Sequence, residues 1–128
     1  MSHLITCIGH DKDSWDAVTR IINSQVFDII YIVTDVFGKN SFLLNNPKAV
    51  TIAYILVDDN DPIDKLNDDI YNSLKKGFGN DKLIDLEIAL NISSGVGRLH
   101  AALISAVMKL GYGIRIIEID KDGDVVAL

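Results

Sequence analysis

The sequence has one cysteine, few basic residues and no long apolar run. Because Cys7 is alone, the chain cannot form an internal disulfide, and its place in an apolar segment predicts a small buried side chain rather than a nucleophile. No apolar stretch reaches the about 20 residues that span a bilayer. Lys and Arg number 12 against 18 Asp and Glu, for a net charge of −6, which argues against broad binding to duplex nucleic acid.

The first residues also lack a basic segment ahead of an apolar one, so we predict no signal peptide and a cytoplasmic protein. The 128 residues, 48% of them hydrophobic, are enough for one core. No linker, repeat or low-complexity segment interrupts them. We therefore expect one domain over residues 1–128.

Short apolar segments alternate with amphipathic ones, which predicts an α/β fold. We expect strands over 4–8, 27–33, 50–57, 83–92 and 114–119, and an antiparallel strand over 125–128 after the hairpin turn at Asp122-Gly123. We expect helices that begin at Asp13 or Ser14, at Asp61-Pro62 with an end at Gly77 or Gly79, and over 95–110, plus a short helix within 36–48. This order indicates a Rossmann-like three-layer sandwich with a mainly parallel sheet of about six strands.

In a Rossmann-like sheet the strand order reverses between the first and fourth strands, and ligands bind outside the carboxyl ends of the strands at that point. The loop over 9–14 and the turn over 91–98 follow these two strands. We therefore expect a His/Asp loop and a Ser/Gly/Arg turn to lie side by side at the edge of the sheet.

The stretch from Leu86 to Arg98 runs from an apolar strand through a Ser/Gly turn into a helix. A helix start leaves backbone N–H groups free, and glycines let a ligand approach them, so this order is typical of an anion site. Arg98 adds a planar cation that suits phosphate. The plainer alternative is a strand-to-helix loop in which Ser93 or Ser94 caps the helix.

The string Asn91-Ile-Ser-Ser-Gly-Val-Gly-Arg98, with Leu99, Ala101-Ala102, Gly111 and the strand over 114–119, resembles the signature of CARF domains, the CRISPR-associated Rossmann-fold family. The opening Thr6-Cys-Ile-Gly-His-Asp11 resembles the first half of such domains. Gly97 is one residue more than the usual spacing before the cation, which puts the direction of Arg98 in doubt.

The resemblance implies a homodimer that binds a cyclic oligoadenylate second messenger across its two-fold axis, as a sensor in CRISPR-linked antiviral signalling. Such a sensor switches an effector domain or a partner protein and needs no cofactor. The ligand contacts it implies fall on both loops: Gly9, His10, Asp11, Asn91, Ser93, Ser94, Gly95, Gly97 and Arg98.

Three alternatives stay open. Some CARF-like proteins are metal-independent ring nucleases, for which Ser94, Arg98 and His10 are the candidate catalytic residues. Asp58, Ser93 and Lys121 partly mimic a phospho-receiver site, with Asp11 and Asp13 in place of an adjacent acid pair. A Rossmann-like domain for another nucleotide is the third. We predict no metal site, because the three histidines lack ligand spacing and helix capping explains the acidic loop over 58–61.

Overall fold

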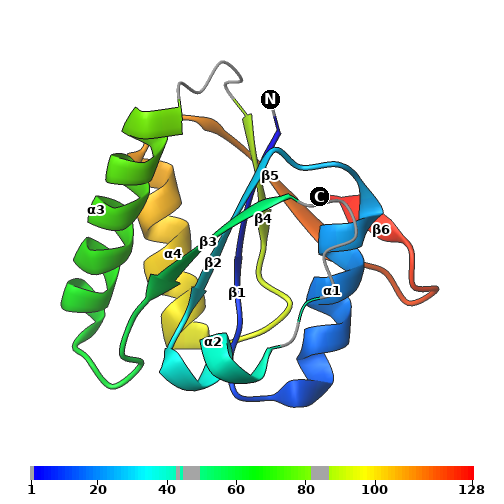
Figure 1. Ribbon diagram of the computed structural model, residues 1–128, viewed down its shortest axis with the longest axis horizontal. Coiled ribbons are helices and arrows are strands. Elements are labelled where there is room, and N and C mark those ends of the chain that lie inside the picture. The colour runs from blue at the N-terminus through cyan, green and yellow to red at the C-terminus, as the bar shows by residue number, and fades with distance from the viewer. Residues whose placement is uncertain (1, 43, 45–49, 82–86) are drawn as a thin grey trace.

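A computed structural model describes residues 2–42, 44, 50–81 and 87–128, and shows six strands in one sheet with helices on both faces (Figure 1). The strands are β1 (His3–Cys7), β2 (Ile29–Thr34), β3 (Thr51–Leu56), β4 (Glu87–Asn91), β5 (Gly113–Ile119) and β6 (Val125–Ala127). The helices are α1 (Trp15–Ser24), α2 (Val36–Ser41), α3 (Ile63–Asp81) and α4 (Gly97–Lys109), with a 3-10 turn (Lys12–Ser14) before α1.

The strand order is β3-β2-β1-β4-β5-β6, and only β6 runs antiparallel to its neighbour. In β1, Leu4 pairs with Ile30 of β2 on one side and with Ala89 of β4 on the other. This order confirms the Rossmann-like prediction and places the reversal between β1 and β4. The phospho-receiver alternative is wrong, because a receiver winds its strands in the order 2-1-3-4-5.

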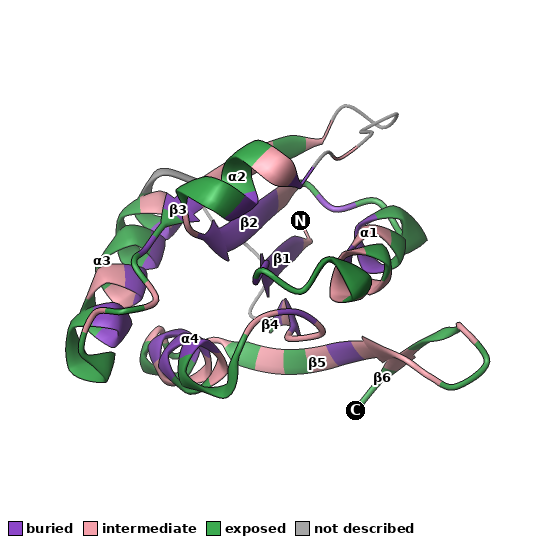
Figure 2. Cartoon of the chain, turned by 90° about the horizontal axis from the view of Figure 1, so that it is seen from below, coloured by how far each residue is buried: buried purple, intermediate pink, exposed green. Residues whose placement is uncertain are grey.

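Helices α3 and α4 cover one face of the sheet, and α1 and α2 lie on the other, as the view from the carboxyl ends of the strands shows (Figure 2). Alternate residues of β1 therefore enter different cores. Ile5 and Cys7 belong to the core beneath α3 and α4, whereas Leu4, and Ile8 just after the strand, belong to the core beneath α1. The sequences of the inner strands are continuously apolar because both faces of these strands are buried.

Helix α3 does not end at Gly77 or Gly79, as the sequence predicted, but continues to Asp81. A Cβ at residue 77 would lie 2.6 Å from the hydroxyl oxygen of Tyr31, so Gly77 lets the helix pack closely against the sheet. Phe78 beside it is 5% exposed and anchors this last part of the helix. Burial thus overrides the weak helix propensity of glycine.

Ser14 occupies the N-cap position of α1, as the sequence predicted, but its side chain makes no capping bond. The 3-10 turn before it is capped by Asp11, whose carboxylate accepts the N–H of Asp13. The part of the predicted fourth strand over 83–86 and much of the stretch over 43–48 lie outside the described residues. Among the described residues, no helix is both long enough and apolar enough to span a bilayer.

Candidate functional site

The loops after β1 and β4 touch each other at the carboxyl edge of the sheet, as predicted. The N–H of Gly9 donates to Ser94 Oγ at 2.9 Å. A Cβ at Gly9 would lie 2.7 Å from Gly95 Cα, a separation that real Cβ atoms essentially never show. Gly95 has φ +97°, a conformation that glycine adopts without strain. The two glycines therefore let the loops meet backbone to backbone.

Ser94 lies inside this contact and joins it together. It is 1% exposed, and its hydroxyl oxygen lies 2.6 Å from Ser14 Oγ in addition to its bond with Gly9. Its carbonyl oxygen lies 2.7 Å from His100 Nε2 and accepts the Cys7 thiol at 2.9 Å. Ser94 thus connects β1, the 3-10 turn before α1, and α4, and its hydroxyl faces protein rather than solvent.

Burial determines the chemistry of Cys7. The thiol is fully buried, and burial, with smaller contributions from the charges of Asp59 and Glu118, raises its pKa to about 12. Thiolates rather than thiols are nucleophiles, so the buried side chain predicted from sequence is also chemically inert.

We expect Cys7 of the folded protein to resist a disulfide reagent such as DTNB at pH 8, because little thiolate is present and the sulfur is inaccessible. The same protein in guanidinium chloride should react with one equivalent. Rapid stoichiometric reaction of the folded protein would contradict this environment for Cys7.

Asn91 is buried and has a structural role. It is 0% exposed, and its amide donates to the carbonyl of Ile117 at 2.8 Å and to Ser93 Oγ at 2.8 Å. Its side-chain oxygen accepts the hydroxyl of Thr6 at 3.1 Å. Asn91 therefore joins β4 to both of its neighbours just where the strands end.

Ser93 is half-buried and donates to Glu118 Oε2 at 2.6 Å. Glu118 is not among the site residues predicted from the sequence. It lies near the end of β5 and reaches the edge because strand order brings β5 beside β4. Glu118 could have been predicted from the sequence, because it is an acidic residue near the end of a strand expected to be parallel.

The side chain of His10 contacts the segment that follows β2. Its Nε2 lies 2.5 Å from Asp35 Oδ2, and its ring packs edge-on against Phe37 with centroids 4.8 Å apart. The other oxygen of Asp35 caps α2 by accepting the N–H of Gly38 at 2.8 Å. Partial burial alone would raise the pKa of Asp35, but the bonds from Gly38 and His10 outweigh it and hold that pKa below its usual value. Asp35 is thus a carboxylate at neutral pH.

Helix α4 begins at Gly97, with Val96 at the N-cap position and no side-chain cap. The expectation that Ser93 or Ser94 caps this helix is therefore wrong, because Gly95 and Val96 separate both serines from its start. Val96, Gly97 and Arg98 are exposed. The first turn of α4 thus presents its backbone to solvent beside the Gly9–Gly95 contact.

Arg98 lies in that first turn, as predicted, but it points toward the loop between β3 and α3. Its guanidinium donates to the carbonyl oxygens of Asp59, at 2.5 Å, and Asp61, at 2.6 Å. The side chain is exposed, so these bonds compete with solvent. Arg98 therefore links the β3–α3 loop to the start of α4.

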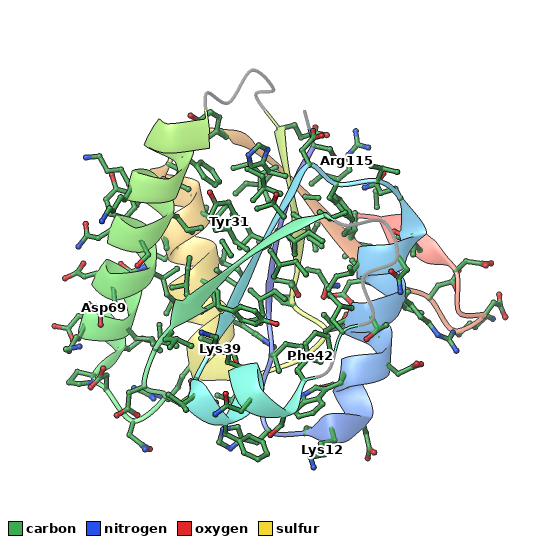
Figure 3. The ribbon with its side chains drawn as sticks, viewed as in Figure 1. Lys12, Tyr31, Lys39, Phe42, Asp69 and Arg115 are labelled. Carbon is green, nitrogen blue, oxygen red and sulfur yellow. The ribbon has the colours of Figure 1, made fainter. Side chains whose placement is uncertain are left out.

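The remaining charges at this edge have mixed sign. Lys12 is 5.8 Å from the ring centroid of Trp15, and Lys39 is 5.7 Å from that of Tyr54. Figure 3 shows Lys12 and Lys39 toward the same end of the sheet and Arg115 at the other end. Asp11 is exposed and engaged in its cap, and Asp61 pairs with Lys65 at 3.1 Å.

Comparisons with known proteins agree on the fold. No family model matches the sequence, and no curated protein matches it. Protein VC1899 from Vibrio cholerae superposes with a TM-score of 0.68 at 10% identity, over 98% of this chain. Enterococcus italicus Csm6 bound to cyclic hexa-2'-fluoro-hexa-dAMP superposes with a TM-score of 0.63 at 14% identity, over 94% of this chain.

This chain covers only 33% and 34% of those two chains. At such low identity the superpositions show the fold alone. The chemistry of the site must be argued from its own residues. The strand order, the two touching loops and these superpositions point the same way. The chain has a Rossmann-type α/β fold, which it shares with both of these structures.

Proposed function

We propose that this chain binds a cyclic oligoadenylate at the carboxyl edge of its sheet, as the sensing domain of an antiviral signalling protein. The observation that carries the proposal is the backbone contact between the loops after β1 and β4, beside the uncapped start of α4. The solved Csm6 structure of similar fold holds a cyclic hexanucleotide analogue.

The structure divides the predicted ligand residues into two groups. Gly95, Gly97, Arg98, His10 and Asp11 are exposed or half-exposed and can reach a ligand. Free N–H groups at the start of α4 suit phosphate, and the Arg98 guanidinium can exchange its carbonyl partners for phosphate oxygens. The other group holds the two loops together through hydrogen bonds inside the protein. It consists of Asn91, Ser94, Gly9 and Ser93.

We also propose a homodimer. A ring of identical nucleotides is symmetric, so two copies of one site can bind it with duplicated contacts. The outer face of α4 offers a surface for this pairing: Ala101, Ile104, Ser105, Met108 and Lys109 line a shallow hollow there, and Met108 is 64% exposed. The small side chains of Ala101 and Ser105 allow close approach of a second helix.

Ring cleavage is the alternative function. It would place a ribose 2′-hydroxyl in line with its own phosphodiester, and would rely on positioning and charge stabilisation. Of the three residues considered for it, Ser94 has its hydroxyl buried and Arg98 binds backbone carbonyls, whereas His10 is exposed. This arrangement favours binding over cleavage.

The experiment is to incubate the protein with cyclic tri-, tetra- and hexa-adenylate in EDTA, then separate bound from free nucleotide and chromatograph both. Linear oligoadenylate of equal length is the control. We expect one ring to be retained intact and the linear control to bind weakly. Linear products would establish the nuclease instead, and retention of no ring would overturn the ligand assignment.

A further inference from the structure

Three side chains from separate loops converge beside the proposed nucleotide site. His10 follows β1, Asp35 follows β2 and Asp59 follows β3, and these strands are adjacent in the sheet. One donor atom from each lies within 4.8 Å of the other two. Parallel strands that end together bring these residues together, although they are 24 or more positions apart in sequence.

We propose that His10, Asp35 and Asp59 bind one divalent cation of the borderline class, such as Zn²⁺ or Co²⁺. One imidazole nitrogen and two carboxylate oxygens form a mixed donor set that such ions favour, whereas Mg²⁺ and Ca²⁺ prefer oxygen alone. Three protein donors leave one coordination position open to solvent or to an anion. From the sequence we predicted no metal site, because the histidines lack ligand spacing and helix capping explains the acidic loop over 58–61; the folded chain adds Asp35 from another loop to His10 and Asp59.

Asp59 provides the independent observation. Its Oδ1 is buried and has no hydrogen-bond partner among the described residues. A buried carboxylate oxygen without a partner is costly, and a cation removes that cost. Arg98, which lies close by, donates to the backbone carbonyl of Asp59 and not to its Oδ1.

The surroundings hold the other two donors in place. Asp35 gives one oxygen to the N–H of Gly38, which fixes its carboxylate and leaves the second oxygen for the site. The ring of Phe37 limits the orientation of His10.

His10 Nε2 and Asp35 Oδ2 are now 2.5 Å apart, closer than two ligands of one tetrahedral ion, which lie about 3.3 Å apart. The pair must therefore open by about 0.8 Å. The exposed ring of His10, with 58% of its side chain accessible, can make that movement.

The test uses the tag-free protein and metal alone, so its outcome does not depend on whether the chain binds a nucleotide. Co²⁺ is titrated while the visible absorption bands of tetrahedral Co²⁺ are recorded, and bound Zn²⁺ is measured by equilibrium dialysis. We expect one ion per chain.

Asp59→Asn should weaken the affinity at least tenfold, because it replaces a charged donor with a neutral amide of equal size. Asp58→Asn is the matched control: Asp58 is the neighbouring acid, is exposed, and accepts the N–H of Asn60 without being one of the three donors, so its variant should bind within about twofold of wild type. Absence of stoichiometric uptake, or equal affinity in Asp59→Asn, would overturn the site.

Discussion

Replacement of Asn91 with alanine should lower the free energy of unfolding by about 2–4 kcal/mol, because it removes several buried hydrogen bonds and leaves the carbonyl of Ile117 and the hydroxyl of Thr6 without their partner. The measurement is urea-induced unfolding followed by circular dichroism. This is the largest stability effect that we expect at the site.

Ser93→Ala is the matched control, because it removes a half-buried hydroxyl from the same network. We expect it to cost less than about 1 kcal/mol. If Asn91→Ala instead left stability unchanged and abolished nucleotide binding, Asn91 would be a ligand residue, as the sequence alone suggested, and its structural role would be refuted.

Arg98→Ala should weaken binding of the cyclic oligoadenylate by about 1.5–3 kcal/mol, which is more than tenfold in Kd, if the guanidinium makes a charge-assisted contact with phosphate. Its stability should change little, because the bonds that it makes to Asp59 and Asp61 are exposed. Calorimetric titration of wild type and variant measures the difference.

Arg115→Ala is the control for lost positive charge. Arg115 pairs with Glu87 at 2.9 Å in an exposed ion pair, at the opposite end of the sheet (Figure 3). Its replacement should leave Kd within about twofold, since exposed pairs contribute little. Equal affinities for Arg98→Ala and wild type would remove Arg98 from the site.

The fold followed from the sequence because local and global signals agree. The apolar strands alternate with helices, and Asp122-Gly123 marks the final hairpin, where Gly123 has φ +85°. One exception is the end of α3. The glycines at 77 and 79 predicted a helix end, but the helix continues past them because Gly77 makes room for Tyr31. A glycine that ends a helix and a glycine that makes room for a neighbouring side chain look the same in the sequence. The tertiary contacts of the folded chain distinguish them.

The site was predicted less completely. The order of strands and loops in the sequence predicted both loops and their contact. It did not predict which side chains of these loops are buried in the protein and which face solvent. The turn at Gly95 places Ser94 inside, and the absence of a cap leaves the start of α4 open. Asp59 was assigned from sequence to an acidic loop explained by helix capping, and Asp35 was not among the candidate residues. Only the order of β1, β2 and β3 brings both of them to His10.

We propose that two copies of this chain bind one ring across their shared axis. The most direct test is a calorimetric titration of the protein with the retained cyclic oligoadenylate, combined with sedimentation analysis at micromolar concentration. We expect a dimer before ligand is added and one ring bound per two chains. A monomer that binds one ring per chain, or no heat with any ring, would contradict it.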